Sequence, residues 1–238
     1  MTLNSLKHSI YSPTVLDIQD DGSSVVCQKM LSQIVETLVS TNLFDIHVEY
    51  ASNQGLIKAR NESYDRLINN GCKYIAVIHN DMMFAKGMFE QLMFIMDNNP
   101  DIGILAAETI KLKNQNTQED LDARQAVANA STTSFFRGNN HPAIMRVSAL
   151  LKILENGKVY DESFGRHDGE DIDLLGRLEY AGYKTLVTTK AWGYHQGEAS
   201  RSSYPDVQKW KDYSRAMYER KWIKKGLQPW DSPNNPNK

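Results

Sequence analysis

Apolar runs with the period of strands alternate with stretches of helical spacing through the first half of the chain. The strand-like runs are residues 15–18, 44–50, 74–78 and 103–107, and the helical stretches are about residues 24–40, 57–69 and 88–98. Strands that alternate with helices predict an α/β fold with a mostly parallel central sheet flanked by helices. The uninterrupted apolar run at 74–78 is typical of a parallel strand that is covered on both faces.

The second half of the chain is less regular. Residues 111–140 are polar and rich in Asn, Gln, Thr and Ser, with a weak helical pattern around 119–130, and we interpret them as a long excursion or lid. Regular structure resumes at residues 143–146. A helix is then predicted over about 170–181, and residues 186–188 form a last strand.

The last part of the chain combines a polar loop with a basic tail. His195 lies in the loop, between Gly193 and Gly197. A basic, aromatic helix is predicted over about residues 204–225, and the Pro- and Asn-rich end after it is expected to fray.

Composition narrows the class of protein. A chain of 238 residues with 41% hydrophobic content can bury a full core, and we expect one domain with two lobes. The net charge of −2 argues against a protein that is basic all over, although a local basic patch stays open. Cys27 and Cys72 have no spacing that suggests a disulfide framework or a zinc site.

No targeting or membrane segment is evident in the sequence. The first residues lack the apolar core of a signal peptide, and no stretch approaches the roughly 18 apolar residues of a membrane span. We therefore expect a soluble, cytoplasmic protein.

Asp81 follows the apolar run at 74–78, after His79 and Asn80. In open α/β sheets, ligands bind at the carboxyl ends of strands. Hard cations such as Mg²⁺ or Mn²⁺ prefer carboxylate oxygens, so Asp81 is a candidate metal ligand. The alternative is that Asn80 or Asp81 caps the segment that follows.

Four acidic residues crowd the start of the helix predicted at 170–181. They are Asp168, Glu170, Asp171 and Asp173. The helix dipole favours acids in a first turn, which explains part of the cluster without any function. Carboxylates this close repel one another unless a cation or ligand compensates, and such an environment also tunes the pKa of a general base.

Two further polar residues lie after the last predicted strand. The imidazole of His195 suits Mn²⁺ and related metals, although a single histidine is more often structural or solvated. Arg201, between Ser200 and Ser202, has the forked donors that hold phosphate oxygens, and the alternative is a solvated loop.

Taken in order, the motifs of this chain resemble the family 2 glycosyltransferases of the nucleotide-diphospho-sugar transferase (GT-A) fold. The resemblance covers roughly residues 13–203 and depends on the order and spacing of the motifs. The matching stretches are Asn53-x-Gly55 with Ala59-Arg60-Asn61, the run at 74–78 closing on His79-Asn80-Asp81, Tyr160-Asp161-Glu162-x-Phe164, Glu170-Asp171-x-Asp173-Leu174 with Arg177 and Ala181-Gly182-Tyr183, and His195-x-Gly197-x-x-Ser200.

The resemblance implies a role for each matched position in the reaction. Asp81 and His195 would hold a Mn²⁺ or Mg²⁺ ion that bridges the donor's diphosphate, with His79 as a further candidate ligand. Asp171 would be the general base toward the acceptor hydroxyl, and Glu170 would either orient the acceptor or support that carboxylate. The reaction would be an inverting transfer of a hexosyl or pentosyl group.

The resemblance also implies how the chain is divided and what it binds. The donor-binding residues would be Asn53, Gly55, Arg60 and Asn80, joined by Arg201. The GT-A domain would span residues 1–203, with a donor lobe at about 10–110 and an acceptor lobe at about 111–203, and residues 204–238 would form the C-terminal helix and tail. The donor would be a nucleotide-diphosphate sugar, UDP-linked by family frequency, and the acceptor a glycan or another hydroxyl compound.

The chain departs from the family pattern at three places, one of which is the second strand, where Tyr50-Ala51-Ser52 replace the usual Asp for base recognition. His79 stands where the DxD-type motif usually has its first acid, so either fewer carboxylates hold the metal or His79 is turned toward the ribose or solvent. The first strand ends in Gln19, Asp20 and Asp21 instead of the common Pro-x-x-Asn pattern. Metal preference and donor choice are therefore where we expect this chain to differ.

Three other functions compete with this interpretation. A transferase that acts on modified bases of DNA would use the basic tail, unless that helix simply packs Trp210, Tyr213 and Met217 onto the core. A non-catalytic nucleotide-sugar-binding module would keep the fold without turnover. A dinucleotide-binding oxidoreductase is disfavoured because no G-x-G-x-x-G follows the first strand.

Overall fold

The main sheet has six strands that run in both directions. The computed structural model describes residues 2–10, 14–111, 117–137, 141–166, 169–196 and 206–223. The strands are β3 (Tyr74–Val77), β4 (Met82–Phe84), β5 (Ile102–Lys111), β6 (Phe135–Arg137), β7 (Ala143–Arg146) and β8 (Lys184–His195). Their order is β3-β7-β5-β8-β4, and β6 also pairs with β8. Only β5 and β8 are parallel neighbours; the other pairings are antiparallel.

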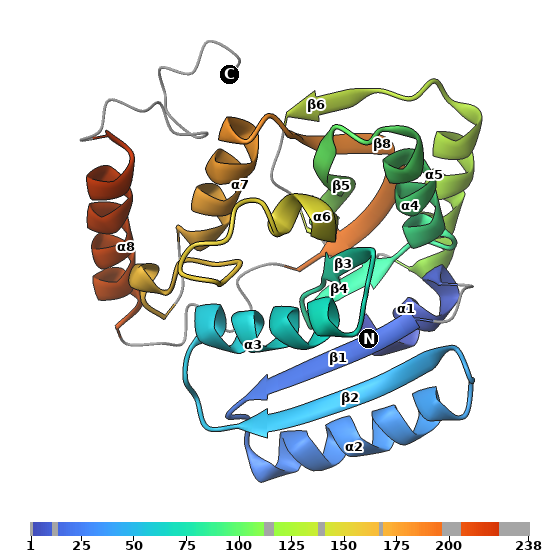
Figure 1. Ribbon diagram of the computed structural model, residues 1–238. Helices are drawn as coiled ribbons and strands as arrows, with labels where there is room; N and C mark the ends of the chain where they lie inside the picture. The colour runs from blue at the N-terminus through green and yellow to red at the C-terminus, as the bar shows by residue number, and fades with distance from the viewer. Residues whose placement is uncertain are drawn as a thin grey trace.

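A second, two-stranded sheet lies beside the main one. Strands β1 (Thr14–Asp21) and β2 (Phe44–Ala51) pair in parallel, and α2 (Val25–Val39) connects them. Figure 1 shows α3 (Leu56–Asn69) between this pair and the main sheet. Arg66 of α3 fixes the helix to β1 because its Nε donates to Asp17 Oδ2 at 2.7 Å.

The core lies on both faces of the main sheet. Alternate residues of a strand point to opposite faces, and β5 illustrates this. Ile104 and Ala106 belong to one buried cluster, and Leu105 and Ala107 belong to the other. The remaining helices are α1 (Thr2–Ser9), α4 (Met88–Asn98), α5 (Gln118–Ala130), α6 (Val147–Leu150), α7 (Glu170–Tyr180) and α8 (Val207–Lys221), with a 3₁₀ turn at Glu162–Phe164. The α/β architecture predicted from the sequence is confirmed, although the central sheet is mixed rather than mostly parallel, because β4, β6 and β7 pair antiparallel with their neighbours.

Strand β3 differs from its prediction. It lies at the edge of the main sheet, and of its residues only Ile75 is buried while Ala76 is exposed. The apolar run predicted a strand covered on both faces. The difference arises because β1 and β2 form a separate sheet instead of extending the main one beyond β3.

Strand β8 is longer than the predicted 186–188 and carries His195 at its end. A register shift between Ala107 and Glu108 of β5 lets β8 bulge and then continue beside β5 and β4. Gly193 contributes to this because a Cβ there would lie 3.2 Å from the carbonyl oxygen of Met83. Gly193, which suggested a loop before His195, instead lies in β8 and allows close strand pairing.

The described part of the predicted excursion is packed structure. Gln125 of α5 is buried and donates to the carbonyl oxygen of Lys190 at 2.7 Å, and it accepts from the backbone of Trp192 at 3.0 Å. Lys190 Nζ in turn donates to the carbonyl of Ala128, at the end of α5, at 2.9 Å. Residues 117–137 are therefore fixed to β8 rather than held out as a lid.

Helix α1 was not predicted from the sequence. Thr2 Oγ1 donates to the carbonyl of Met82 at 2.8 Å and accepts from its N–H at 3.0 Å, so α1 supports β4 directly after Asp81. Its only sequence signal is the spacing of Leu3, Leu6 and Ile10. Among the described residues, no helix combines the length and apolar character that a membrane span requires.

Candidate metal and catalytic site

The first part of the candidate site lies where β3, β4 and β8 meet. His79 and Asp81 lie in the turn between β3 and β4, and His195 pairs with Met82 at the end of β8. Asp81 Oδ1 lies 3.2 Å from His195 Nε2, and His79 Nδ1 lies 3.3 Å from the same nitrogen. One potential ligand atom from each of the three lies within 4.8 Å of the others. Two imidazoles and a carboxylate suit Mn²⁺ and neighbouring metals.

Arg60 joins these residues to the acidic start of α7. It lies on α3, and its side chain is only 11% exposed. Nη2 lies 3.0 Å from His79 Nε2, whereas Nη1 lies 3.3 Å from Glu170 Oε1 and 3.2 Å from Asp171 Oδ1. The predicted metal residues and the predicted base therefore form one continuous chain of contacts.

The contact with Arg60 determines the proton positions in this chain. A guanidinium only donates hydrogen bonds, so His79 Nε2 must accept and Nδ1 of the neutral ring carries the hydrogen. That hydrogen faces His195 Nε2, which accepts it. His195 Nε2 and Asp81 Oδ1 are then two hydrogen-bond acceptors that lie 3.2 Å apart. A cation stabilises such a pair. Asp81 and His195 thus fit a metal ion as they stand, and His79 can join them only when Arg60 releases its Nε2.

The same contacts shift the pKa values of His79 and Asp171. Burial, followed by the nearby His141 ring and the Arg60 guanidinium, lowers the pKa of His79 to about 3, so the ring is neutral at pH 7. Burial alone would raise the pKa of Asp171, but Arg60 and then His141 hold it well below its usual range. Asp171 is therefore an ionised carboxylate at neutral pH.

The acidic cluster divides into two groups. Glu170 is buried and turns with Asp171 toward Arg60. Asp173 is fully buried and bonds to Arg177 Nε at 2.8 Å on another side of the helix. The fourth acid of the cluster, Asp168, lies outside the described residues.

His141 is a site residue that the sequence analysis missed. It lies two residues before β7, its Nε2 lies 3.6 Å from Asp171 Oδ2, and its ring centroid lies 4.5 Å from that of His79. Both of its ring nitrogens are buried without a hydrogen-bond partner. The polar stretch before 143 carried no signal for it, because its position depends on β7 inserting between β3 and β5.

Gly55 is the N-cap of α3 and Asn53 lies two residues before it, so both directly precede the helix that carries Arg60. Asp21 at the end of β1 holds this segment, because its carboxylate accepts from the N–H groups of Gln54 at 2.7 Å and Gly55 at 2.8 Å. Arg166 Nη2 donates to the carbonyl oxygen of Asn53 at 3.2 Å. The acid that looked like a departure from the family pattern thus organises the predicted nucleotide segment.

The other two predicted donor residues are less informative. Asn80 is exposed between His79 and Asp81. Arg201 lies outside the described residues.

The C-terminal helix packs against the domain. Ser214 and Trp222 are buried, Met217 and Tyr218 are half-buried, and Tyr213 is 51% exposed. This is the packing expected of an amphipathic terminal helix, although Tyr213 contributes less burial than predicted.

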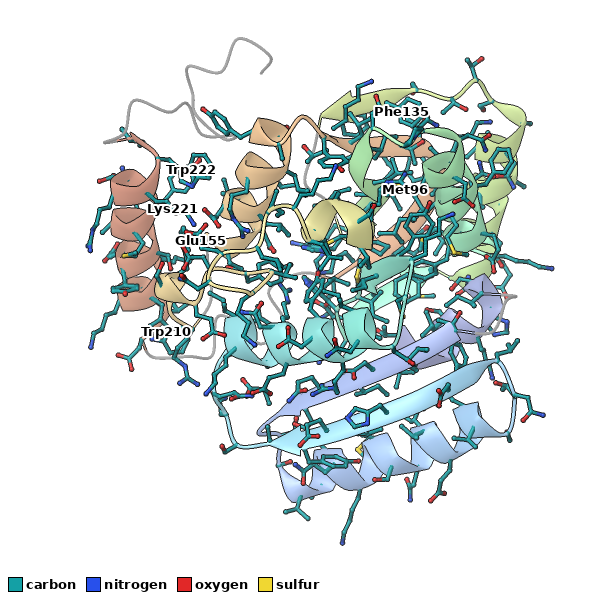
Figure 2. The ribbon with its side chains drawn as sticks, in the orientation of Figure 1. Met96, Phe135, Glu155, Trp210, Lys221 and Trp222 are labelled. Carbon is teal, nitrogen blue, oxygen red and sulfur yellow. The ribbon has the colours of Figure 1, made fainter. Side chains whose placement is uncertain are left out.

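The basic residues of the helix do not form one solvated face. Lys209, Lys211, Arg215 and Arg220 are exposed. Figure 2 shows that Lys221 instead lies beside Trp222 on the side facing α7 and Glu155. Lys224 and Lys225 lie outside the described residues.

Comparison with known proteins supports the fold. No protein-family profile and no curated protein matches the sequence. A solved structure described as the crystal structure of GalNAc-T7 with UDP, GalNAc and Mn²⁺ is similar, with a TM-score of 0.58 and 13% sequence identity. The match covers 92% of this chain and 46% of that chain, so this chain spans about half the length of that protein. At this identity the likeness shows the fold, which is that of the GT-A glycosyltransferases; membership of family 2 stays a prediction.

Proposed function

We propose that this protein is an inverting, metal-dependent glycosyltransferase. The observation that carries the proposal is the chain of contacts from Asp81 and His195 through His79 and Arg60 to Asp171. A transferase needs a cation beside the departing diphosphate and a base beside the attacking hydroxyl. These contacts bring candidate metal ligands, Asp81 and His195, and a candidate base, Asp171, into one site.

On the donor side, Asp81 and His195 would hold the metal. A bound Mn²⁺ or Mg²⁺ ion neutralises charge that develops on a leaving diphosphate. Arg60 is a buried cation in contact with His79, and a diphosphate would attract its guanidinium. Its movement would release His79 Nε2 and let His79 turn its Nδ1 to the metal.

On the acceptor side, Asp171 would take the proton from the attacking hydroxyl. The carboxylate is ionised at neutral pH, and Arg60 weakens its basicity by holding its pKa low. If the donor draws Arg60 away, Asp171 becomes the stronger base in the complex that needs it. Glu170, on the same guanidinium, would keep the first turn of α7 in place.

The proposed donor is a nucleotide-diphosphate sugar. Asn53 and Gly55 at the start of α3, with Arg60, would contact the nucleotide and its phosphates, joined by Asn80 and Arg201. The related fold of a glycosyltransferase crystallised with UDP and Mn²⁺ supports a UDP-linked sugar as the first candidate. The acceptor class is a compound with a free hydroxyl group, and a glycan is the first to test.

Binding of the donor is tested by a thermal-shift screen of nucleotide sugars with and without Mn²⁺. A ligand that binds only the folded protein raises its melting temperature. We expect a UDP-sugar to raise it in the presence of Mn²⁺ and to do so weakly in EDTA. A screen in which no nucleotide sugar shifts the melting temperature contradicts the proposal.

Catalysis is tested with Asp171→Asn. Loss of a general base lowers turnover by about 10²–10⁴-fold. We expect such a fall in sugar transfer while the UDP-sugar still shifts the melting temperature. Asp97→Asn, which alters an exposed carboxylate on α4, is the matched control. If Asp171→Asn leaves the protein's activity intact, the non-catalytic binding module is the better description.

A further inference from the structure

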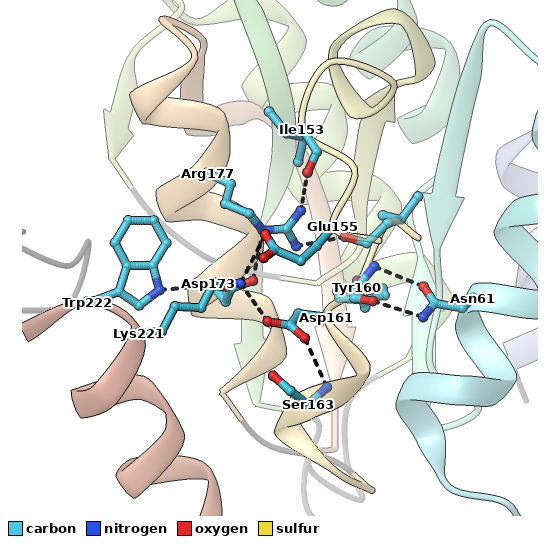
Figure 3. A network of polar contacts seen from close by, with 11 residues as sticks. Asn61, Ile153, Glu155, Tyr160, Asp161, Ser163, Asp173, Arg177, Lys221 and Trp222 are labelled. Carbon is cyan, nitrogen blue, oxygen red and sulfur yellow. Dashed lines mark hydrogen bonds and ion pairs between the residues drawn. The ribbon is translucent and has the colours of Figure 1, made fainter. Parts of the chain in front are cut away.

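Helix α8 is attached to the domain through a buried ionic network. Lys221 Nζ lies 2.6 Å from Asp161 Oδ2, 3.0 Å from Asp173 Oδ1 and 3.3 Å from Glu155 Oε2. The Lys221 side chain is 15% exposed, and Asp161 and Asp173 are almost fully buried, whereas Glu155 lies at the solvent-exposed edge of the network. Figure 3 shows Lys221 reaching from α8 into the centre of this group.

Asp173 is the most buried member of the network, and α8 supplies two of its partners. Besides the bond from Arg177, it accepts from Lys221 and, at 2.9 Å, from Trp222 Nε1. Arg177 also donates to the carbonyl of Val159 at 2.7 Å. A buried carboxylate that loses such partners is strongly disfavoured, so Asp173 links the position of α7 to the docking of α8.

The surface of α7 is shaped to receive this contact. The Trp222 ring stacks on Tyr180, with ring centroids 5.4 Å apart. A Cβ at Gly176 would lie 3.2 Å from the same indole ring. Glycine is unfavourable inside a helix, and here its missing side chain is what admits Trp222.

Asp173 and Asp171 lie two positions apart on α7, so they point to different sides of its first turn. Asp171 meets Arg60, whereas Asp173 meets Lys221 and Trp222. The turn that carries the proposed base is therefore held from two directions.

The helix that carries Arg60 is connected to the same network. Asn61 exchanges two hydrogen bonds of 2.9 Å with the backbone of Tyr160, directly before Asp161. Asp161 also caps the 3₁₀ turn by accepting from the N–H of Ser163 at 2.9 Å. Lys221 thus contacts both of the segments that bring Arg60 and Asp171 together.

We propose that Lys221, assisted by Trp222, is a positioning residue that holds Asp171 in register with Arg60 by clamping Asp173 and Asp161. Its ion-pair partners, Glu155, Asp161 and Asp173, are not among the proposed donor, metal or catalytic residues. The inference rests on the proposed function only for the role of Asp171; the clamp itself is a property of the fold.

The kinetic test compares Lys221→Met with Lys209→Met, the same change at an exposed position of α8. Misplacing a reacting group by about 1 Å can cost up to about a hundredfold in rate. For Lys221→Met we expect kcat to fall about tenfold or more per donor-binding molecule, with an unchanged KM for the nucleotide sugar. Lys221→Arg, which keeps the charge, should retain most of the activity, and Lys209→Met should be like the wild type.

A second measurement tests whether Lys221 holds α7 in place, and it does not depend on sugar transfer. Hydrogen exchange should become faster over residues 170–176 in Lys221→Met but not over β5. Trp222→Phe, which removes both the N–H donor to Asp173 and the part of the indole that packs on Gly176, should show a change in the same direction, and it serves if Lys221→Met does not fold.

The inference is overturned if kcat per donor-binding molecule is unchanged in Lys221→Met. It is also overturned if hydrogen exchange rises equally in β5 and α7. In either case Lys221 would stabilise the whole domain without positioning Asp171. If the wild-type protein transfers no sugar at all, the proposed function fails. The exchange result still decides whether Lys221 holds α7 in that case.

Discussion

At the scale of single residues, Arg60 connects the proposed metal residues to the proposed base. One guanidinium holds the neutral His79 ring, the buried Glu170 and the ionised Asp171. Each of these groups would behave differently without it: His79 could offer Nδ1 to a metal, and Asp171 would be a stronger base. Arg60 therefore stabilises a resting arrangement that a bound diphosphate would rearrange.

Replacing Arg60 should strengthen binding of Mn²⁺ to the donor-free protein. Arg60→Met removes a positive charge beside the metal residues and frees His79 Nε2, and both changes favour a cation. We expect the dissociation constant for Mn²⁺ to fall about tenfold, which is the size of effect typical of residues that hydrogen-bond to metal ligands. Titration calorimetry measures it, with Arg66→Met as control on the same helix. Equal or weaker Mn²⁺ binding in Arg60→Met would contradict the assigned tautomer of His79.

Gly55 should tolerate substitution poorly. Its φ of 99° is unfavourable for other residues, and a Cβ would lie 3.1 Å from the Cα of Arg166. Gly55→Ala should lower the free energy of unfolding by about 1–3 kcal/mol and weaken donor binding. Gly71→Ala is the matched control, because its φ is 77° and nothing lies within 4 Å of an added Cβ. Urea denaturation of both variants checks this, and a loss no larger than that of Gly71→Ala would count against a close contact at Gly55.

At the scale of elements, local sequence patterns predicted most of the helices. Helix α4 has the predicted bounds of 88–98, and α3 begins within one residue of its prediction, because both have an uninterrupted apolar stripe. Strand β8 was predicted too short because its continuation depends on a bulge and on pairing with two strands distant in sequence. Neither feature has a local signal.

The candidate site shows the same limit. Asp81, Asp171 and His195 could be proposed from the sequence because each lies in a stretch that resembles a family 2 glycosyltransferase motif. His141, Asp21 and Lys221 could not, because their roles depend on contacts across the fold. A histidine before a short strand and a lysine in a basic tail have no special meaning until the elements are assembled.

The docking of α8 should weaken in acid. The Lys221 ammonium and the N–H of Ser163 outweigh the effect of burial and lower the pKa of Asp161 from its ordinary value of 3.8. A carboxyl group whose pKa is lower in the folded than in the unfolded protein stabilises the folded state at pH values above its unfolded-state pKa. This stabilisation is lost as the pH falls through its folded-state pKa. We expect hydrogen exchange in α8 to accelerate below about pH 4 in the wild type.

Asp161→Asn separates this titration from general acid unfolding. The amide cannot ionise, so its α8 should exchange faster at neutral pH and should show a smaller further change in acid. An acid transition of α8 that is unaltered in Asp161→Asn would assign it to another group.

At the scale of the whole molecule, the metal residues connect segments that are far apart in the chain. Asp81 follows β3, and His195 ends β8 after more than a hundred further residues. A cation held by both would connect the β3–β4 turn to the end of β8, so that binding should stabilise the whole domain.

Mn²⁺ alone should therefore raise the melting temperature. A ligand present at 100 times its dissociation constant stabilises the folded state by about 2.7 kcal/mol. We expect the shift to disappear in EDTA and in His195→Gln, and to persist in His47→Gln, which alters an exposed histidine of β2. A Mn²⁺ shift that survives in His195→Gln would place the ion elsewhere.

The position of β8 also has a consequence for how the chain folds. This strand pairs with β4, β5 and β6, although it comes after all of them in sequence. Pairings between such distant segments are slow to form because a long loop must close first. During synthesis, β4 and β5 must wait, with their edges unpaired, until residues 184–195 emerge. His195 therefore reaches Asp81 only late in folding, and a metal ion can stabilise the finished protein without guiding its early assembly.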